Sequence, residues 1–169
     1  MNATNGFTHE STYNESVEWY TPPSIFDALG LRFDLDVASP GASVVPWVPV
    51  DRHLTFEDSG LLQPWRGRVW CNPPYGNETA AWVEKFCQHG NGVMLVFART
   101  DVGWFHKHAK KADAICFIRG RVKFIRADGF SGAGSGAGSM LIACGVECAE
   151  AVRGCGLGMI FEPYREQSA

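Results

Sequence analysis

Residues 69–76, VWCNPPYG, join a short apolar run to a rigid turn. The apolar residues predict a buried strand that ends at Asn72, because the two prolines that follow have no N–H with which to continue a sheet. The proline pair also restricts the backbone of the turn, so the side chain of Asn72 is expected in one defined position. The sequence therefore predicts a strand that ends in a polar side chain with a fixed position.

Helices and strands are expected to alternate on both sides of this turn. Apolar runs and alternating patterns predict strands within 31–39, 53–56, 92–98, 114–120, 121–127, 140–145 and 158–164. Helical patterns are found within 18–30, 78–90, 102–110 and 146–154, with Thr21 as a candidate N-cap and Gly90 as a stop. This order predicts an α/β fold with a mainly parallel sheet, helices on both faces and a ligand site at the carboxyl ends of the strands.

The composition is that of one globular domain. The chain has 169 residues, of which 46% are hydrophobic and 20% are charged, and this length is sufficient to bury a core. We expect a polar leader over residues 1–17 and a folded domain over 18–169. No apolar run approaches the ~20 residues that span a bilayer, so a cytoplasmic protein without membrane contact is expected.

Charge and cysteine content exclude some classes of function. The net charge of −3 argues against a broad phosphate-binding surface, so any contact with nucleic acid must be local. Two basic runs, HKHAKK (106–111) and RGRVKFIR (119–126), are candidates for it, with a solvated surface as the alternative. The six cysteines form no CxxC pair and no Cys/His set at zinc spacing, so they predict reduced core residues and no metal site.

Polar side chains at the predicted strand ends suggest what the site binds. Asp36, Asn72 and Asp101 all follow strand patterns. The Asn72 side-chain carbonyl and the free Pro73 carbonyl are two acceptors that suit the two hydrogens of an amino group. Tyr75 supplies a flat face for stacking on a planar base. A plain turn with a surface tyrosine, and a helix cap at Asp101, are the alternatives.

A low-complexity segment, GFSGAGSGAGS, occupies residues 129–139. Its Gly, Ala and Ser content predicts a flexible loop. A phosphate-binding loop is disfavoured, because an apolar strand pattern follows where a phosphate site requires a helix N-terminus. The segment is either a plain linker or a mobile loop beside the site.

Six segments together resemble the amino-methyltransferases of DNA, whose catalytic motif is (D/N/S)PP(Y/F). The resemblance is greatest to the small phage-type DNA N6-adenine methyltransferases, the phage relatives of Dam. The segments are EWYTPP (18–23), FDLDVAS (33–39), EDSGLLQPW (57–65), VWCNPPYG (69–76), VFARTDVGWFH (96–106) and RGRVKF (119–124). The resemblance implies a single Rossmann-like methyltransferase domain, although the glycine-rich FxGxG of many methyltransferases is missing.

The resemblance implies S-adenosyl-L-methionine as the cofactor. The implied cofactor-binding residues are Tyr20, Thr21, Pro22, Asp34 or Asp36, Ala38, Asp58 and Asn72. Carboxylates suit the cofactor's ammonium group and its amino and hydroxyl donors. As alternatives, Asp36 is an exposed acid at a strand end and Asp58 forms a turn. Trp19 and Trp65 either wall the cofactor or belong to the core, and the core is the preferred interpretation.

The resemblance also implies a mechanism on double-stranded DNA. The catalytic residues would be Asn72, Pro73, Pro74 and Tyr75. A flipped adenine would stack on Tyr75, while the two acceptors hold its N6 hydrogens and stabilise the positive charge that builds on nitrogen. Arg99, Thr100, Arg121 and Lys123 are expected to contact DNA. Because no large target-recognition domain is present, a homodimer would supply further DNA-binding surface.

Three alternatives share these sequence features. The methyl acceptor could be cytosine N4 or the side-chain amide of a protein glutamine. Enzymes that methylate cytosine N4 have serine more often than asparagine at the first position of the motif, which disfavours that acceptor. The third alternative is a module of the same fold that binds the cofactor without catalysis. The intact NPPY motif favours the enzyme over this module.

Overall fold

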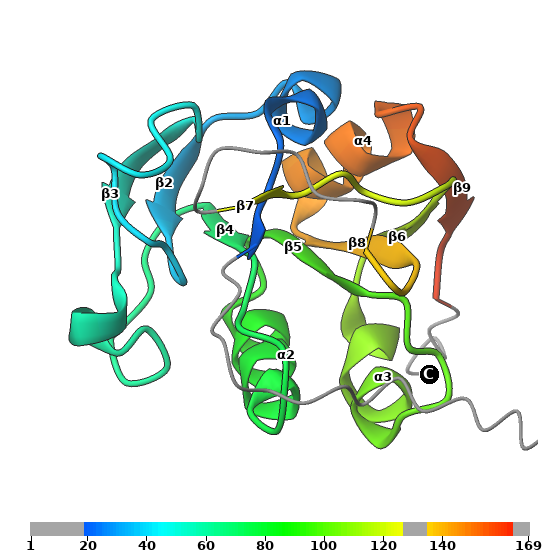
Figure 1. Ribbon diagram of the computed structural model, residues 1–169. Coiled ribbons are helices and arrows are strands. Elements are labelled where there is room, and N and C mark those ends of the chain that lie inside the picture. Colours follow the sequence, from blue (N-terminus) through cyan, green and yellow to red (C-terminus); the bar gives the residue numbers. More distant parts are fainter. Residues whose placement is uncertain (1–18, 127–134, 164–169) are drawn as a thin grey trace, which may run out of the picture.

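A seven-stranded sheet runs through the computed structural model, which describes residues 19–126 and 135–163 (Figure 1). The strand order is β3-β2-β4-β5-β8-β6-β9, and β1 and β7 form a separate two-stranded sheet. The strands are β1 (Trp19–Tyr20), β2 (Phe33–Asp36), β3 (Val50–His53), β4 (Val69–Cys71), β5 (Gly92–Phe97), β6 (Ala114–Ile118), β7 (Ile125–Arg126), β8 (Ser139–Cys144) and β9 (Gly158–Phe161). The helices are α1 (Pro23–Leu29), α2 (Thr79–His89), α3 (Gly103–His108) and α4 (Val146–Gly154), with 3₁₀ turns η1 (Phe56–Asp58) and η2 (Ala109–Lys111).

One half of the sheet is parallel, as the alternating pattern predicts. Strand β2 pairs in parallel with β3 and β4, and β4 pairs in parallel with β5. Parallel neighbours have their carboxyl ends at one edge of a sheet. The residues that follow β2, β4 and β5 therefore meet at the same edge, where the sequence places its polar side chains.

The other half pairs antiparallel, so the sheet is mixed and the prediction of a mainly parallel sheet is met in part. Strand β8 lies antiparallel between β5 and β6, and β9 lies antiparallel beside β6. Strands β5 and β6, joined through α3, run in the same direction on either side of β8. Strand β8 lies between them and runs in the opposite direction.

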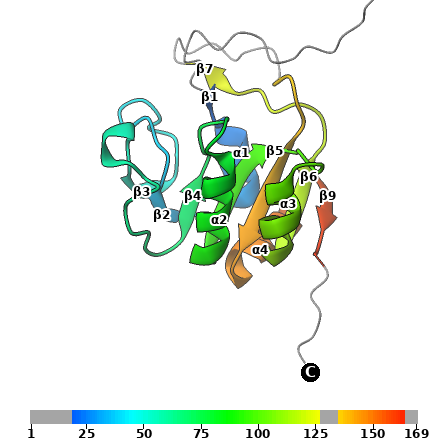
Figure 2. The same ribbon diagram turned by 90° about the horizontal axis from the view of Figure 1, so that it is seen from below.

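Helices cover both faces of the sheet, which confirms that prediction. Figures 1 and 2 show α1 and α4 on one face, with α2 and α3 on the other. The first face packs Phe26, Phe33 and Trp70 against one another, with Phe26 and Trp70 ring centroids 4.7 Å apart. The second face packs α2 residues such as Val83 and Phe86 onto the strands. The α/β architecture therefore rests on two separate apolar layers.

Most predicted elements are present, and four local predictions need correction. Helix α1 has Pro22, not Thr21, as its N-cap, and Val102 precedes α3 without any side-chain cap, so Asp101 does not cap that helix. Strand β3 ends at His53, whereas the sequence predicts a strand over 53–56. In the described part of the predicted strand 121–127, only β7 (Ile125–Arg126) is a strand. Val122 and Phe124 belong to the same core cluster as the buried residues of α1, but they lie outside any strand.

Some predictions fall on residues that the structure does not describe. The leader over 1–17 lies outside the described residues, and so does most of the 129–139 segment, of which only 135–139 are described. All six cysteines are free thiols, and all but Cys87 are buried. None of the helices in the described ranges combines the length and the apolar character needed to cross a bilayer.

Gly60 marks a close contact between the β3–β4 connection and the end of β2. A Cβ atom at this position would lie 2.0 Å from the carbonyl oxygen of Val37 and 2.8 Å from Cη2 of Trp82. Real Cβ atoms do not approach backbone this closely. The Gly60 carbonyl also accepts a hydrogen bond from Trp65 Nε1 at 2.8 Å. Only glycine allows the connection to lie this close to the strand.

We expect Gly60→Ala to lower the free energy of unfolding by roughly 1–3 kcal/mol, because the new methyl group must displace backbone. Urea unfolding followed by circular dichroism measures the change. Gly154→Ala in α4 is the matched control, since no heavy atom lies within 4 Å of the position that its Cβ would take. The control should be neutral or more stable by about 0.5–1 kcal/mol. Equal midpoints for Gly60→Ala and the wild type would contradict the contact.

Candidate functional site

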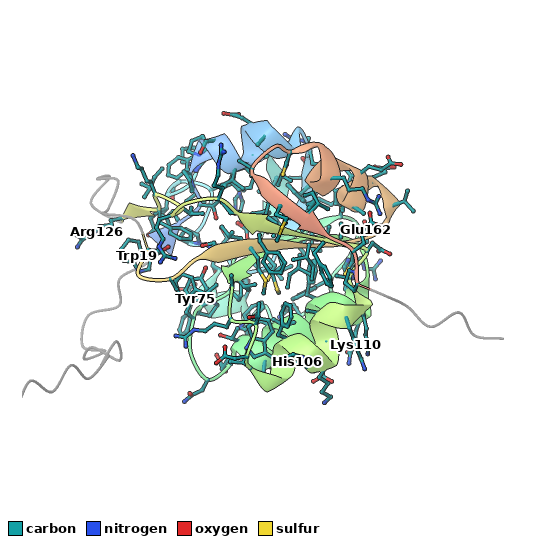
Figure 3. All side chains as sticks on the ribbon, turned by 90° about the vertical axis from the view of Figure 1, so that its right-hand side faces the viewer. Trp19, Tyr75, His106, Lys110, Arg126 and Glu162 are labelled. Atoms are coloured by element: carbon teal, nitrogen blue, oxygen red, sulfur yellow. The ribbon has the colours of Figure 1, made fainter. Side chains whose placement is uncertain are left out.

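The carboxyl ends of β2 and β4 place Asp36 and Asn72 on neighbouring strands. Asp36 is the last residue of β2 and pairs with Trp70, and Val37 N donates to the Trp70 carbonyl at 3.1 Å. Asn72 directly follows β4. In Figure 3, Trp19, Tyr75 and Arg126 lie at one end of the molecule, far from Glu162 and Lys110. The structure therefore gathers at this end the NPPY turn and residues 19–23, which we call the opening segment.

Asn72 is held by hydrogen bonds at both ends of its amide. Its Nδ2 donates to the Trp19 carbonyl at 3.0 Å, so the opening segment determines which way the amide points. Its Oδ1 is thereby directed at Tyr75, whose hydroxyl donates to it at 3.3 Å. The predicted acceptor is present in a fixed orientation, and in this structure it is already hydrogen-bonded.

Tyr75 is half-buried and stacks on a second aromatic ring. Its ring centroid lies 3.9 Å from that of Phe97, at an interplanar angle of 13°. Burial, with a smaller contribution from Cys71, raises the pKa of Tyr75 far above its usual value, so the hydroxyl stays protonated and can donate. Within the turn, Pro73 is buried and Pro74 is exposed. Among the described residues no backbone N–H donates to the Pro73 carbonyl.

The opening segment places a buried hydroxyl without a partner beside this turn. Tyr20 and Thr21 are both buried, and the Thr21 carbonyl accepts a hydrogen bond from Trp47 Nε1 at 2.9 Å. Thr21 Oγ1, by contrast, makes no hydrogen bond within the described part of the chain. A buried hydroxyl without a partner is unfavourable. This atom is therefore suited to a ligand that supplies the missing hydrogen bond.

Asp36 is a buried carboxylate with few partners. The residue is only 3% exposed, and its Oδ1 accepts a hydrogen bond from Ala38 N at 3.2 Å. Burial raises the pKa of Asp36 to about 7, against the lowering effect of hydrogen bonds from Ala38 and Ser39. Burial also lowers the pKa of His53, whose Nδ1 lies 4.0 Å from Asp36 Oδ2. Since burial disfavours both charged forms, we treat this pair as a polar contact and not as an ion pair.

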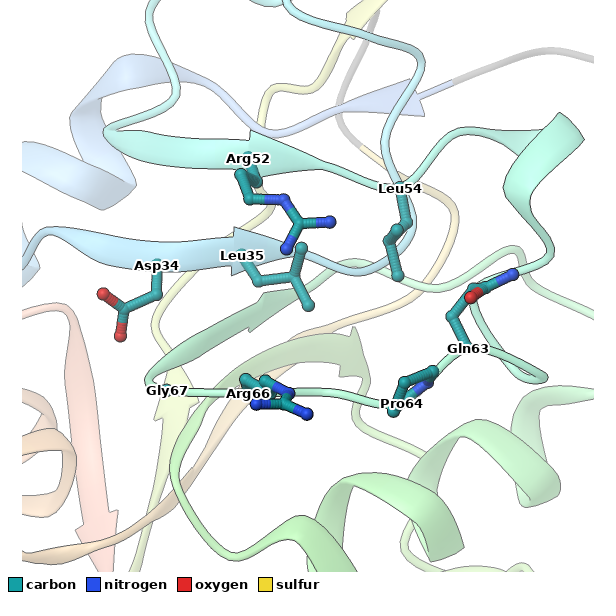
Figure 4. Close-up of a pocket in the computed structure, with 8 residues that line it drawn as sticks. All are labelled: Asp34, Leu35, Arg52, Leu54, Gln63, Pro64, Arg66 and Gly67. Carbon is teal, nitrogen blue, oxygen red and sulfur yellow. The ribbon is translucent and has the colours of Figure 1, made fainter.

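Asp34 is placed away from the strand-end site. Its Oδ2 accepts the backbone N–H of Arg68 at 2.6 Å and thus caps the start of β4. Figure 4 shows Asp34 at one side of a pocket of about 410 Å³ that Arg52 and Arg66 also line. Neither Asp36 nor the NPPY turn lines this pocket. Of the two candidate carboxylates, only Asp36 lies with Asn72.

Asp58 closes a local turn. Its Oδ2 accepts hydrogen bonds from Thr55 N at 2.7 Å and Thr55 Oγ1 at 2.9 Å. These bonds, with Arg52 as a weaker contributor, lower the pKa of the exposed Asp58 carboxyl. The turn role that the sequence leaves open is thus present, and a role toward adenosine stays a prediction.

Lys85 of α2 anchors the segment that follows Asp58. Its Nζ donates to the carbonyls of Gly60, Leu61 and Gln63 at 3.1, 2.6 and 2.6 Å. It also lies 4.8 Å from the centroid of the Trp65 ring, whose face attracts a cation. The sequence identifies Lys85 only as a residue of the helix. No pattern in the chain could have indicated three carbonyl partners from another segment.

The candidate DNA-binding residues reach the same edge of the sheet from two segments. Arg99 and Thr100 are exposed directly after β5. Arg121 is exposed, and its Nη1 would lie 3.3 Å from a Cβ placed on Gly138, next to Ala98. Lys123 is also exposed, whereas its neighbour Phe124 is in the core. The structure therefore brings Arg121 to the end of β5.

Phe97 and Trp19 are the two site residues that sequence reasoning missed. Phe97 ends an apolar strand, so its pattern is that of a core residue. Trp19 contributes its backbone carbonyl, which no sequence pattern can mark. The segment VFARTDVGWFH already contains Phe97, and its position at a strand end beside the NPPY strand was the available signal.

One comparison with known proteins returned a match. A family model described as DNA N-6-adenine-methyltransferase (Dam) matches residues 10–146. The matched range includes every described strand from β1 to β8, and thus the NPPY turn and Asp36. No curated protein and no solved structure matched the chain.

The burial of Asp36 predicts a stability change with a defined pH dependence. The folded pKa is about 7, against 3.8 as the ordinary value. Ionising the buried acid is unfavourable, so its contribution to stability is complete below the unfolded pKa and is lost as pH rises through about 7. Asp36→Asn should therefore raise the free energy of unfolding at pH 8 by roughly 1–3 kcal/mol, the usual cost of one poorly satisfied buried polar group.

Urea unfolding at pH 8 and at pH 4 tests this expectation. The advantage of the Asn variant should shrink as pH falls, because the wild-type carboxyl becomes protonated. Asp27→Asn, at an exposed position of α1, is the matched control and should change stability little at either pH. A destabilised Asp36→Asn protein at pH 8 would show that the charged carboxylate is needed for folding.

Proposed function

The chain belongs to the DNA N-6-adenine-methyltransferase (Dam) family, a family of enzymes, and from this we infer that it methylates the N6 amino group of adenine in double-stranded DNA with S-adenosylmethionine as donor. The observation that carries this proposal is the fixed amide of Asn72. Its Nδ2 is bound to the Trp19 carbonyl, so Oδ1 is the atom left to face a ligand. An oriented acceptor at the carboxyl end of a strand is what an amino-group substrate requires.

Two acceptors act on the substrate nitrogen. Asn72 Oδ1 and the Pro73 carbonyl each accept one N6 hydrogen, which favours a pyramidal nitrogen with its lone pair free to attack. As the new bond forms, positive charge develops on nitrogen, and both oxygens stabilise it. An asparagine side chain does not take up a proton at neutral pH. The proton is therefore released to solvent after transfer.

Tyr75 provides the stacking surface for the base. An adenine inside a duplex cannot present its amino group to the site, so it must be flipped out of the helix. A flipped base is then stabilised by stacking on an aromatic ring. The orientation of the Tyr75 ring, which is nearly parallel to the ring of Phe97, supports this role.

The residues around Asp36 fit the methyl donor. S-adenosylmethionine supplies an activated methyl group, and it carries ammonium and hydroxyl donors that suit a carboxylate. Asp36 is a buried acceptor with few partners, and Thr21 Oγ1 is a buried hydroxyl that lacks one within the described residues. We assign Asp36, Thr21 and the Tyr20–Pro22 backbone to the cofactor, together with Ala38 and Asn72. Asp58 is proposed for the adenosine part.

Local basic side chains are proposed to bind the DNA backbone. Arg121 lies beside Ala98 and Gly138 at the end of β5, and Arg99 and Thr100 follow that strand. Arg99 and Arg121 supply positive charge at the edge that holds Asn72, and the exposed Lys123 follows Arg121 by two residues. Such local charge can contact phosphates despite the net negative charge of the chain. A homodimer that extends this surface stays a prediction.

Incubation with methyl-labelled S-adenosylmethionine and unmethylated genomic DNA, followed by digestion to nucleosides, tests the proposed reaction. We expect label in N6-methyladenosine. Asn72→Ala should lower turnover at least a hundredfold, a loss typical of removing one oriented hydrogen-bonding group from a transition state, while cofactor binding persists. Asn91→Ala, at an exposed residue before β5, is the control. Label in N4-methylcytosine, or only in protein, would favour the alternative acceptors.

Cofactor affinity should depend on pH through Asp36. The ionised carboxylate is the form that binds ammonium and hydroxyl donors, and the pKa of Asp36 in the free protein is about 7. Affinity should therefore fall as pH drops from 8 to 6. Calorimetric titration of S-adenosylmethionine across this range measures the effect. Asp36→Asn should bind more weakly and lose the pH dependence, and an unchanged profile in this variant would assign the dependence to another group.

A further inference from the structure

The acceptor oxygen needed by the substrate is occupied in this structure by the protein itself. Tyr75 donates its hydroxyl to Asn72 Oδ1 at 3.3 Å. This distance exceeds the 2.5–3.0 Å range usual for O–H···O hydrogen bonds. The bond is therefore weak and easily exchanged. An incoming amino group has to take the place of this hydroxyl on the same oxygen.

Phe97 determines the plane in which the Tyr75 ring lies. The two rings are nearly parallel, at 13°, with centroids 3.9 Å apart. Phe97 is the last residue of β5 and pairs with Ser139 of β8, so its backbone is part of the sheet. The next residue, Ala98, donates its N–H to the Gly138 carbonyl at 2.8 Å. A ring mounted on this rigid strand end can keep a second ring in place while its hydroxyl changes partner.

We propose that Phe97 is a positioning residue that keeps Tyr75 flat for the target base, while the Tyr75 hydroxyl reserves Asn72 Oδ1 until the base amino group displaces it. This inference rests on the function proposed above. A base that stacks on Tyr75 does so on the ring face turned away from Phe97, which gives three parallel rings. The hydroxyl keeps the Asn72 amide oriented in the free protein, and Phe97 prevents the tyrosine ring from swinging out when that contact is exchanged.

Steady-state methylation of unmethylated genomic DNA by the full chain tests both parts. Phe97→Leu keeps an apolar side chain of similar size but removes the flat ring. The free energy of one aromatic pair corresponds to a roughly two- to tenfold change in rate. The kcat of Phe97→Leu should therefore fall by that factor, while its dissociation constant for S-adenosylmethionine is unchanged. Phe97→Tyr should restore kcat, because it restores the ring. Tyr75→Phe should lower KM for DNA by roughly two- to tenfold, the range of one hydrogen bond.

Phe117→Leu is the matched control. Phe117 is a half-buried β6 residue whose ring centroid lies 6.3 Å from that of Phe161, and β8 separates its strand from β5. It should leave both kinetic constants at wild-type values, which separates loss of the Tyr75 stack from a general change in the core. Equal kcat values for Phe97→Leu and the wild type, or failure of Phe97→Tyr to restore kcat, would overturn the role of Phe97.

An unchanged or raised KM for DNA in Tyr75→Phe would overturn the exchange at Asn72. A wild-type protein that places no label on adenine would instead contradict the proposed function. The two failures are therefore distinguishable in one set of assays.

Discussion

The hydrogen bond from Asn72 Nδ2 to the Trp19 carbonyl joins two segments that are 53 positions apart in the chain. It is the contact that gives the amide a direction, since an asparagine side chain is otherwise nearly symmetric in shape. Trp19 is itself held by pairing with Arg126 of β7 and by an edge contact with Phe124, at 6.1 Å between ring centroids. The acceptor at the strand end is thus a property of the assembled fold and not of the NPPY tetrapeptide alone.

Local patterns predicted those parts of the fold that local chemistry determines. Strand β4, strand β5 and helix α2 follow from apolar runs and from Gly90, which adopts the left-handed conformation at the helix end. The direction of β8 could not be predicted, because its apolar run is the same pattern for either strand direction and its neighbours are distant in the chain. Thr21 has the right residue type for a helix cap, but Pro22 takes that position and leaves the hydroxyl buried.

The site shows the same division between local and long-range information. Asn72 and Tyr75 were identified from their motif. Phe97, whose ring stacks on Tyr75, had the sequence pattern of any other core residue. Two aspartates, Asp36 at a strand end and Asp58 in a turn pattern, were both assigned to the cofactor by the resemblance, and they differ in the structure by burial. Asp36 is almost fully buried and Asp58 is exposed. Tertiary packing alone distinguishes an acid that is unfavourable to ionise from one that closes a turn.

The antiparallel placement of β8 constrains the length of the short stretch that leads into it. Because β8 runs opposite to β5, it begins at the edge where β5 ends, and Phe97 pairs with Ser139 there. Ala98 donates its N–H to the Gly138 carbonyl, and Ser135 donates its N–H to the Val122 carbonyl. The register of β8 is fixed against both β5 and β6. An inserted or deleted residue between Ser135 and Ser139 would therefore break one of these bonds or displace β8 from its two neighbours.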